Sequence, residues 1–357
     1  MNFSIKEKLN IEERENIISF LNTLPFYCVE QHPDWNIKIE EYFHSFFVCT
    51  DENNHIVSFA NIILSNGPLK TAQINYGPAF NDFEVLKMVI KFLHNFFLSR
   101  KYIFLSIQLG IDISNQTELL EYNINRDFKV KYHFKPGNLW ASVFVDLTRS
   151  ENEILKSFSN GHRRRIKNSY SKNKISIKIE NDKVHLLLFV KLFMKMSNLK
   201  KLGYVEKEIT HLFNSINAFI YDNNKGFILY IFQENDLVGG LIIVYQGKSA
   251  RVYKGATDPE RRDIPISHLG IFEAIKRCKA NGYIKLDLWG YNHFAKKNDQ
   301  VYSINEFKKG FSADFIFFPK RMNFILKPFN YNLYLFLKFC KQKMRSSIHK
   351  IIAIPSL

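Results

Sequence analysis

The sequence lacks the short signatures of several common enzyme and binding classes. It contains no GxxxxGK[ST], GxGxxG, GxSxG or HExxH motif. It therefore does not predict a P-loop kinase or ATPase, a dinucleotide-binding domain, a serine hydrolase or a zinc protease. Its four cysteines, Cys28, Cys49, Cys278 and Cys340, form no CxxC pair. This argues against a structural metal site or a disulfide framework and suits a reducing compartment.

Long apolar runs are also missing. No run of about 18 uninterrupted apolar residues occurs, so no helix is expected to span a bilayer. The first residues, MNFSIKEKLNIEERE, are charged and have no apolar core, so no secretory signal peptide is expected. These observations predict a cytoplasmic protein.

Acidic residues are absent from two segments, Lys156–Lys178 and Phe315–Leu357. Each segment contains eight Lys or Arg residues and no Asp or Glu, so together they account for the formal net charge of +16. The remainder of the chain is neutral. Such basic segments attract polyanions, which include nucleic acid, phosphorylated ligands and an anionic membrane surface.

The sequence does contain enough apolar material for two cores. Of its 357 residues, 46% are hydrophobic and 34 are phenylalanine, and this length predicts about two domains. One order of elements (three strands, a helix and a further strand) is expected twice. The copies cover 46–50, 56–64, 74–76, 83–100 and 102–109, and then 226–233, 237–245, 250–256, 266–281 and 284–289. The repeat predicts an α/β (α+β) chain of two similar domains with a boundary near residues 148–150.

The C-terminal segment 321–357 is basic and aromatic. Leu333, Phe336, Leu337 and Cys340 can share one face of a helix, with lysines elsewhere on it. Such a helix can lie in a membrane interface, here at the inner face of the plasma membrane. It can equally pack on the first domain and leave a basic face in water, and both alternatives stay open at this point.

The stretch from Tyr283 to Ser312 has the most distinctive organisation. Ile284, Leu286 and Leu288 alternate with other residues, which predicts a half-buried strand that ends at Gly290. A polar loop with several lysines follows it. A strand that ends in a basic loop is a frequent position for a functional site.

No covalent nucleophile stands out in this stretch, so any chemistry there depends on positioning. A protein can bring an amine and an activated acyl group together and supply positive charge for the developing oxyanion. Lys308 fits that role if its segment folds back over the end of the strand. Asp287 can either accept a proton from the amine or orient the next loop.

The run from Arg251 to Gly290, together with the segment 301–318, resembles the C-terminal signature of the FemABX aminoacyltransferases. The residues that match are Tyr253, Gly255, Ala256, Thr257, Arg261 or Arg262, Gly282, Tyr283, Asp287, Gly290, Phe307, Lys308, Gly310 and Phe311. SFSNGHRRRIKNS is similar to the helix that opens the family's second domain, with Arg163 and Ile166 in place.

Two segments of the first domain carry the same resemblance. QHPDWNIKI resembles a family segment with Trp35 and Lys38 in place, and INYGPAFND resembles another with Tyr76 and Asp82 in place. Altogether the resemblance covers about residues 25 to 335.

The resemblance implies two GNAT-like domains, each a mixed, mostly antiparallel sheet flanked by helices, with a cleft between them. The first domain would comprise residues 1–149 completed by 321–357, and the second would comprise 150–320. It also implies an aminoacyltransferase that uses no cofactor. This enzyme would move an amino acid from aminoacyl-tRNA to an amine of a nucleotide- or lipid-linked peptidoglycan precursor, in cell-wall cross-bridge synthesis.

The same resemblance assigns roles to individual residues. Lys308 would lie near the acyl centre, with Asp287 as the second catalytic candidate. Four residues would hold the precursor: Trp35, Lys38, Tyr76 and Asp82. Further substrate-binding candidates are Arg163, Lys207, Tyr253 and Phe307. The two basic segments would meet the phosphates of tRNA and of the precursor.

The chain also departs from the family pattern. It lacks the usual Pro-Arg pair before Gly77 and Pro78, it has Lys207 where arginine is common, and no heptad run indicates a coiled-coil insertion. The alternative function is an acyl-CoA-dependent N-acyltransferase acting on a surface-glycan or lipid-linked amine. ATDPERRDIP is the nearest match to a pyrophosphate-binding loop of the GNAT type. A third hypothesis is a non-catalytic tRNA- or membrane-binding protein.

Overall fold

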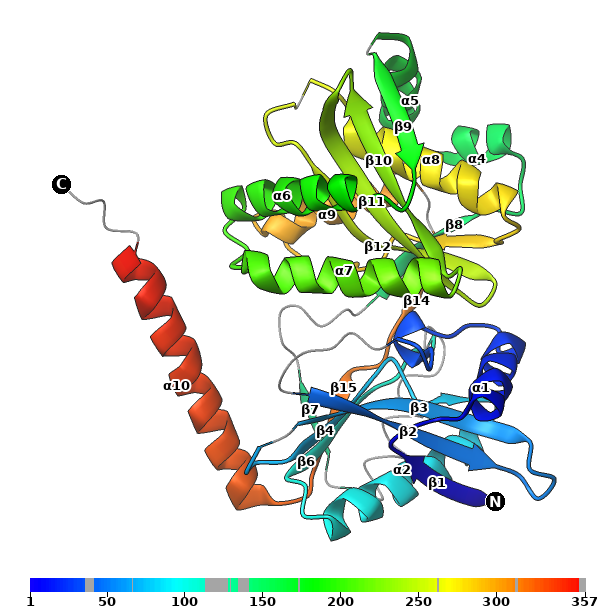
Figure 1. The fold of residues 1–357 in the computed structure, drawn as a ribbon, viewed down its shortest axis with the longest axis vertical. Coiled ribbons are helices and arrows are strands. Elements are labelled where there is room, and N and C mark those ends of the chain that lie inside the picture. Colours follow the sequence, from blue (N-terminus) through cyan, green and yellow to red (C-terminus); the bar gives the residue numbers. More distant parts are fainter. Residues whose placement is uncertain are drawn as a thin grey trace.

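Two β-sheets, each covered by helices, form two lobes that lie one above the other in Figure 1. The computed structural model describes residues 1–35, 42–65, 67–112, 128, 130–133, 141–172, 174–261, 263–311 and 314–352. We call the eight-stranded sheet with its helices the first lobe, and the seven-stranded sheet with its helices the second lobe. The two mixed, helix-flanked sheets confirm the predicted fold class.

The sheet of the first lobe has the strand order β1-β2-β3-β4-β6-β15-β7, with β5 paired to β3. The strands β4 and β6 are parallel, and the other described pairs of this sheet are antiparallel. Its strands are β1 (Asn2–Lys6), β2 (Tyr42–Thr50), β3 (Ile56–Ser65), β4 (Thr71–Asn75), β5 (Ala79–Phe80), β6 (Phe104–Gln108), β7 (Val130–His133) and β15 (Arg321–Ile325). Its helices are α1 (Ile11–Thr23), the short η1 (Val29–Gln31) and α2 (Phe83–Ser99).

The sheet of the second lobe has the order β14-β8-β13-β12-β11-β10-β9. Its strands are β8 (Ala141–Asp146), β9 (Ile175–Ile179), β10 (Gly226–Gln233), β11 (Asp236–Gln246), β12 (Ser249–Thr257), β13 (Lys285–Asp287) and β14 (Asp314–Phe317). Its helices are α4 (Glu151–Ser157), α5 (Asn160–Lys172), α6 (Lys183–Leu199), α7 (Glu206–Asp222), α8 (Ile266–Ala280) and α9 (Gln300–Lys309).

Both lobes contain the same unit of three antiparallel strands, a crossover helix and a parallel strand. In the first lobe the unit is β2-β3-β4-α2-β6, and in the second it is β10-β11-β12-α8-β13. Pairing is parallel between β4 and β6 and between β12 and β13. A parallel pair needs a crossover connection, which the helix supplies. The repeat predicted from the order of elements is therefore confirmed.

Helix α2 shows how the sequence determines the layer that covers the first sheet. Its apolar residues recur every three or four positions, so Val85, Val89 and Leu93 are buried against the sheet. Full burial of one such side chain contributes about 1.5–3 kcal/mol. The carboxylate of Asp82 caps the helix by accepting a hydrogen bond from the backbone N–H of Glu84 at 2.6 Å.

The second sheet is covered on both faces by different helices. Side chains of α8 share one apolar core with β8, β11 and β13, and side chains of α6 and α7 share another core with β10 and β11 (Figure 1). This arrangement explains why the central strands of the lobe are apolar on both sides.

Two strands lie in a different lobe from their neighbours in the sequence. The predicted boundary near 149 placed 140–147 in the first domain, but β8 pairs with β13 and β14 in the second sheet. That part of the prediction is wrong by one strand. Strand β15, which follows β14 closely in sequence, pairs with β6 and β7 of the first sheet. The chain thus crosses between the lobes before β8 and again before β15. The lobe to which each of these strands belongs is determined by pairing with strands that are distant in the sequence.

The stretch 283–312 also differs from its prediction. Strand β13 stops at Asp287, and both Leu286 and Asp287 are fully buried, so the strand is covered on two faces rather than half-buried. It ends because Trp289 and Gly290 adopt left-handed backbone angles, with φ of 53° and 57°. The basic segment beyond it includes helix α9.

The last helix, α10 (Pro328–Ile352), begins on the first lobe and points away from both sheets at its C-terminal end (Figure 1). Tyr331 is 1% exposed and packs edge-on against Phe104, with 5.4 Å between ring centroids. Among the helices that the structure describes, none combines the length and the apolar character needed to cross a bilayer.

Candidate functional site

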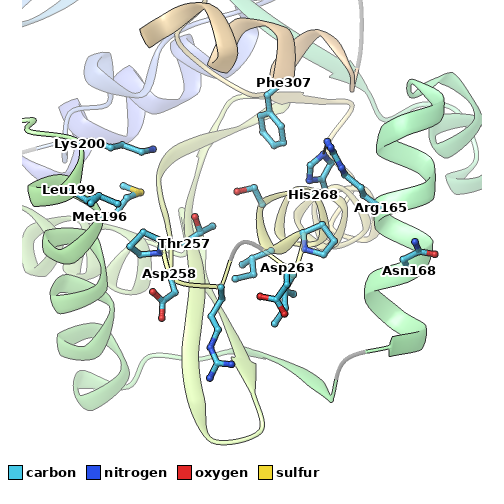
Figure 2. Close-up of a pocket in the computed structure, with 16 residues that line it drawn as sticks. Arg165, Asn168, Met196, Leu199, Lys200, Thr257, Asp258, Asp263, His268 and Phe307 are labelled. Carbon is cyan, nitrogen blue, oxygen red and sulfur yellow. Dashed lines mark hydrogen bonds between the residues drawn. The ribbon is translucent and has the colours of Figure 1, made fainter.

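A pocket of about 860 Å³ lies in the second lobe, beside the crossover loop 258–265 that joins β12 to α8 (Figure 2). Its wall comes from α5, the C-terminal end of α6, the crossover loop with the start of α8, and α9. The lining residues are Arg165, Asn168, Met196, Leu199, Lys200, Thr257, Asp258, Pro259, Arg261, Asp263, Ile264, Pro265, Ile266, Ser267, His268 and Phe307. A concave space of this size suits a small-molecule or cofactor-sized group.

Polar contacts hold the crossover loop at the edge of the pocket. The backbone N–H of Asp258 donates to Val238 O at 2.8 Å, and the Asp258 carboxylate accepts from Glu260 N at 3.1 Å. From α6, the Lys195 ammonium lies 3.0 Å from Asp258 and 2.8 Å from Glu260. The loop is thus tied both to β11 and to α6.

Two histidines meet between α5, α8 and α9. His268 lines the pocket, and its ring centroid lies 4.5 Å from that of His162. Burial lowers the pKa of His268 to about 3 and also lowers the pKa of His162. The Nε2 of His162 lies 2.9 Å from the carbonyl oxygen of Phe307, so Nε2 carries the proton and Nδ1 accepts from Ser159 at 2.9 Å. Both rings are therefore uncharged at neutral pH.

Positive charge predominates around the pocket. Arg165, Lys200 and Arg261 line it, together with two carboxylates, Asp258 and Asp263. The carboxylate of Asp258 is paired with Lys195 of α6 and the guanidinium of Arg261 with Asp236 at 3.6 Å, which leaves Arg165 and Lys200 against Asp263. The net charge of the lining side chains is therefore positive, which favours an anionic group on a ligand.

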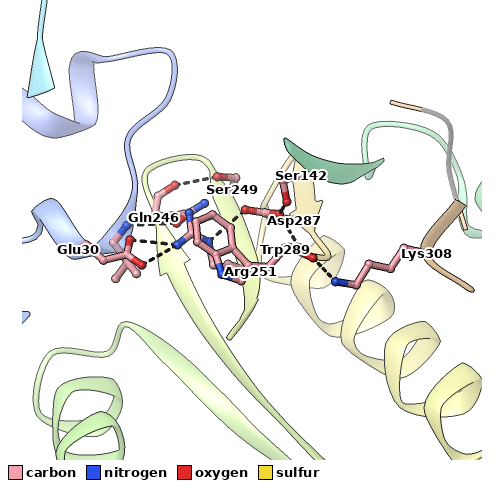
Figure 3. A network of polar contacts seen from close by, with 9 residues as sticks. Glu30, Ser142, Gln246, Ser249, Arg251, Asp287, Trp289 and Lys308 are labelled. Carbon is pink, nitrogen blue, oxygen red and sulfur yellow. Dashed lines mark hydrogen bonds and ion pairs between the residues drawn. The ribbon is translucent and has the colours of Figure 1, made fainter. Parts of the chain in front are cut away.

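A buried polar network joins the two lobes (Figure 3). The side chain of Arg251 on β12 is fully buried, and its Nε donates to Asp287 at 3.0 Å. Its Nη1 donates to both carboxylate oxygens of Glu30, at 3.1 and 3.0 Å. Glu30 belongs to η1 of the first lobe, so one guanidinium connects both lobes. Removing one partner of such a buried pair costs about 3–5 kcal/mol.

Asp287 orients the turn that follows β13. It sits opposite Arg251 in the parallel register of β12 and β13. Its carboxylate accepts hydrogen bonds from Ser142 Oγ, from Arg251 Nε and, at 2.7 Å, from the backbone N–H of Trp289. These contacts correspond to the second of the two roles considered for this residue. Asp287 is not among the described residues that line the pocket, and a catalytic role for it stays a prediction.

Lys308 binds the same turn from the other side (Figure 3). Its ammonium donates to the carbonyl oxygens of Trp289 and, at 2.7 Å, of Gly290. Burial lowers the pKa of Lys308 to about 8, and the charge of Asp287 opposes that shift. The ammonium does not point into bulk solvent, yet the pocket wall is formed by the neighbouring Phe307 rather than by Lys308. Its role near the acyl centre stays a prediction.

Two strained aromatic residues meet where the lobes touch. Tyr76 has φ 56° and Trp289 has φ 53°, and their ring centroids lie 5.0 Å apart. The guanidinium of Arg251 lies 3.4 Å from the centre of the Trp289 ring. A non-glycine residue in this backbone region costs about 1–3 kcal/mol, and it persists only where its surroundings fix it. The joint between the lobes is therefore specified by contacts from both sides.

Trp35 and Tyr253 come together as predicted substrate-binding residues, but in an apolar contact between the lobes. Their ring centroids lie 5.2 Å apart, and Trp35 also packs edge-on against Phe219 at 4.8 Å. Trp35 is 5% exposed. The pair forms part of an inter-lobe core.

The other predicted substrate-binding residues are dispersed. Asp82 caps α2, Arg163 donates to the carbonyl oxygen of Lys156 at 2.6 Å, and Lys207 is exposed in the first turn of α7. Lys38 lies outside the described residues. Of the predicted site residues that the structure describes, Phe307 alone lines the pocket.

Sequence reasoning missed three residues that organise this region. His268 follows the proline that ends the crossover loop, Arg165 ends a run of three arginines, and Arg251 interrupts an apolar strand. A polar residue near the start of a helix after a loop, or a charged residue within a strand, was the available signal. Neither pattern identifies a partner across the fold.

Comparison with solved structures relates about nine tenths of the chain to tandem GNAT-like folds. The chain is similar to the crystal structure of FemX, with a TM-score of 0.79 and 12% identity over 93% of this chain and 99% of that one. It is also similar to L-PGS from Bacillus licheniformis (TM-score 0.55, 13% identity, 90% of this chain and 93% of that one). A tandem GNAT protein from the clavulanic acid biosynthesis pathway gives a TM-score of 0.54 at 8% identity, over 90% of this chain and 98% of that one.

At the level of sequence, no family model matches the chain and no curated protein matches it. The structural likenesses therefore establish the fold. The FemABX-like architecture of two GNAT-like units, which the sequence motifs implied, is confirmed.

Proposed function

We propose that this protein is an acyltransferase that moves an amino acid from aminoacyl-tRNA to an amine of a peptidoglycan precursor. The observation that carries the proposal is the cationic pocket beside the crossover loop, in a chain whose fold is similar to that of FemX. In the reaction the acceptor nitrogen attacks the ester carbonyl carbon, and the bond from that carbon to the tRNA ribose oxygen breaks. The nitrogen loses a proton as the amide forms, and the departing ribose oxygen gains a proton to become the free hydroxyl of the tRNA.

This chemistry suits a pocket without an evident nucleophile. An activated ester needs an acceptor held at the correct distance and angle, and such positioning can supply several kcal/mol of the barrier. Three neighbouring side chains from three helices line one part of the pocket (Figure 2): the neutral ring of His268 lies 4.9 Å from the ring of Phe307, and the guanidinium of Arg165 lies 3.5 Å from His268 Nε2. A cation beside the reacting ester stabilises the oxyanion that develops there.

The basic helix α5 favours tRNA as the donor. Arg165 and Asn168 of α5 line the pocket, and the exposed residues Arg164 and Lys167 continue along the same helix. A ligand that extends beyond the pocket and carries a phosphate at each nucleotide would meet this helix. Because aminoacyl-tRNA is a cytoplasmic substrate, the proposal also places the reaction in the cytoplasm.

Lys308 and Asp287 act as positioning residues in this proposal. They hold the turn at Trp289 from opposite sides, and Lys308 belongs to the helix that presents Phe307 to the pocket. Replacing Lys308 would then lower the rate of transfer while leaving donor binding in place. The proposal does not depend on precursor binding by Trp35 or Tyr76, because both lie in contacts between the lobes.

The second candidate is an acyl-CoA-dependent N-acyltransferase acting on a surface-glycan or lipid-linked amine. It is favoured by the position of the pocket, next to the loop that precedes α8. Backbone N–H groups at the start of a helix bind phosphate groups well. The segment ATDPERRDIP, which the sequence singled out, supplies most of this side of the pocket.

A donor comparison tests both candidates. Purified protein is incubated with bulk tRNA charged with radiolabelled amino acids and a nucleotide-linked peptidoglycan precursor, and label in the precursor is measured by chromatography. A parallel reaction replaces the tRNA with a panel of labelled acyl-CoA thioesters. The variant Ser267→Trp, which fills the pocket, is the control in both reactions.

Transfer from aminoacyl-tRNA that disappears in the filled-pocket variant supports the first candidate. Transfer from a thioester alone replaces it with the second. If neither donor is used above the level of Ser267→Trp, the pocket is not an acyl-donor site and the proposed function fails.

A further inference from the structure

Helix α10 presents large apolar side chains to solvent. Phe329 is 82% exposed, Phe336 is 62% exposed, Leu337 is 49% exposed and Leu333 is 42% exposed. Leu333, Phe336 and Leu337 follow Phe329 by four, seven and eight residues, so the four side chains share one side of the helix. An exposed contiguous apolar face of this kind marks an interaction surface.

The opposite side of α10 is already occupied. Tyr331 and Tyr334 pack against Phe104 of the first sheet, with ring centroids 5.4 and 5.2 Å away. The helix is therefore fixed to the first lobe by its first turns, with its C-terminal end directed away from both lobes (Figure 1). The apolar face lies on the side that does not contact the sheet.

Charge identifies what can cover this face. From Phe315 to the end of the chain there are eight Lys or Arg residues and no Asp or Glu. Five of these basic residues, Lys338, Lys341, Lys343, Arg345 and Lys350, belong to α10, so two copies of the helix brought together would repel each other, which opposes a dimer. An RNA partner would match the charge but would leave the exposed phenylalanines and leucines without an apolar environment. An anionic bilayer satisfies both requirements at once.

We propose that α10 docks this protein on an anionic membrane surface. The helix lies in the plane of the headgroups, with Phe329, Leu333, Phe336 and Leu337 among the upper acyl chains, and the net positive charge of the helix is attracted by the lipid phosphates. This mode of binding requires an amphipathic helix and no membrane span. The surface lies on the first lobe, whereas the pocket is in the second, so this inference is independent of the proposed reaction.

Vesicle flotation tests the proposal with the full-length protein. Wild type is mixed with phosphatidylcholine vesicles that contain about 30% phosphatidylglycerol, and with vesicles of phosphatidylcholine alone. We expect partitioning to the anionic vesicles to be at least about tenfold stronger, and to weaken as sodium chloride is raised. The double variant Phe329→Gln/Phe336→Gln should bind the anionic vesicles about tenfold or more weakly, because two aromatic rings no longer enter the bilayer.

The matched control is Val184→Gln, which removes a 66% exposed apolar side chain from α6. It should float like wild type. Equal thermal unfolding midpoints of the three proteins establish that the variants are folded, as the exposure of the replaced side chains leads us to expect.

Three outcomes would overturn the proposal. One is wild type that does not float with anionic vesicles, and a second is a double variant that floats like wild type. The third is a dimer, detected by sedimentation velocity without lipid, that the double substitution converts to monomer. That result would assign the face to a second copy of the chain.

Discussion

The two crossover loops have the same place in the topology, but only the second borders the pocket described above. In the second lobe, the loop between β12 and α8 stands beside α5 and α6 and borders about 860 Å³ of space. In the first lobe, the equivalent segment between β4 and α2 folds back on the sheet, where β5 pairs with β3. Ser58 Oγ donates to Ala79 O at 2.7 Å and holds this segment down.

Gln31 completes the closure of the first loop. It is fully buried, its Nε2 donates to Asn75 O at 2.7 Å, and its Oε1 accepts from Asn61 N at 3.1 Å. A Cβ added to Gly77 would lie 2.3 Å from the Gln31 side chain, so the loop and this side chain fit only because residue 77 is glycine. The comparison shows that one topology provides an open pocket or a closed joint, depending on what fills the space before the crossover helix.

The largest effect is expected from filling the open loop. Ser267 is the second residue of α8 and lines the pocket, so Ser267→Trp places an indole in the ligand space. We expect transfer to fall to the level of the blank, at least about a thousandfold, which corresponds to roughly 4 kcal/mol. The measurement is the initial rate with the donor identified by the comparison described above.

The matched control is Glu84→Trp, which changes the second residue of α2 in the closed lobe. That side chain is exposed, and the variant should retain the wild-type rate. Equal loss in both variants would show that the two loops are not functionally different.

The next largest effect is expected from opening the closed loop. Gln31→Ala removes both hydrogen bonds to buried backbone groups and leaves a cavity, which should lower the free energy of unfolding by about 3 kcal/mol. Urea denaturation followed by circular dichroism measures it. Gln73→Ala, which removes a partly buried amide that contacts the side chain of Asn75, should cost less than about 1 kcal/mol. A loss below that value for Gln31→Ala would mean that the amide does not hold the loop closed.

A smaller effect is expected from removing one cation of the open pocket. Arg165→Ala should lower the rate at subsaturating aminoacyl-tRNA by about tenfold and reduce the salt dependence of binding by about one phosphate contact. Arg164→Ala changes the adjacent residue, which is exposed on the same helix and is not among the described lining residues. It should have a smaller effect on the rate. The opposite order would place the donor outside the pocket.

Much of this comparison could be predicted from sequence, because local patterns determine it. The periodicity of α2 and the order of strands and helix gave both copies of the repeated unit, since each depends on residues close together in the chain. The exchange of β8 and β15 between the lobes depends on pairing over more than a hundred residues, as in Phe144 with Asp287. Short patterns carry no information about such pairing.

The candidate site was less predictable than the fold. The motifs drew attention to Lys308 and Asp287, and the structure brings both to one turn, although neither is among the described pocket residues. Arg165 lies on α5, Lys200 follows the end of α6 and His268 lies on α8, and other elements separate them in the sequence. Their proximity depends on how the helices pack in the folded chain, so the sequence alone could not predict it.

The smallest expected effect concerns the turn that joins the closed loop to the open lobe. Tyr76, the first residue after β4, packs against Trp289, and the Lys308 ammonium holds the backbone of that turn. Burial lowers the pKa of Lys308 from 10.5 to about 8, so folding disfavours the charged form. The unfolded chain then binds more protons than the folded chain between these two pKa values, and stability must rise with pH there. Between about pH 7 and pH 9 this single group should add about 1 kcal/mol to the free energy of unfolding.

Lys308→Met keeps most of the packing but has no titratable group, so the difference in stability between wild type and Lys308→Met should shift by this amount in urea titrations at the two pH values. A pH-independent difference would mean that the ammonium is stabilised by its two carbonyl partners as well as it is by water, and that the turn is held by a fully charged lysine throughout this range.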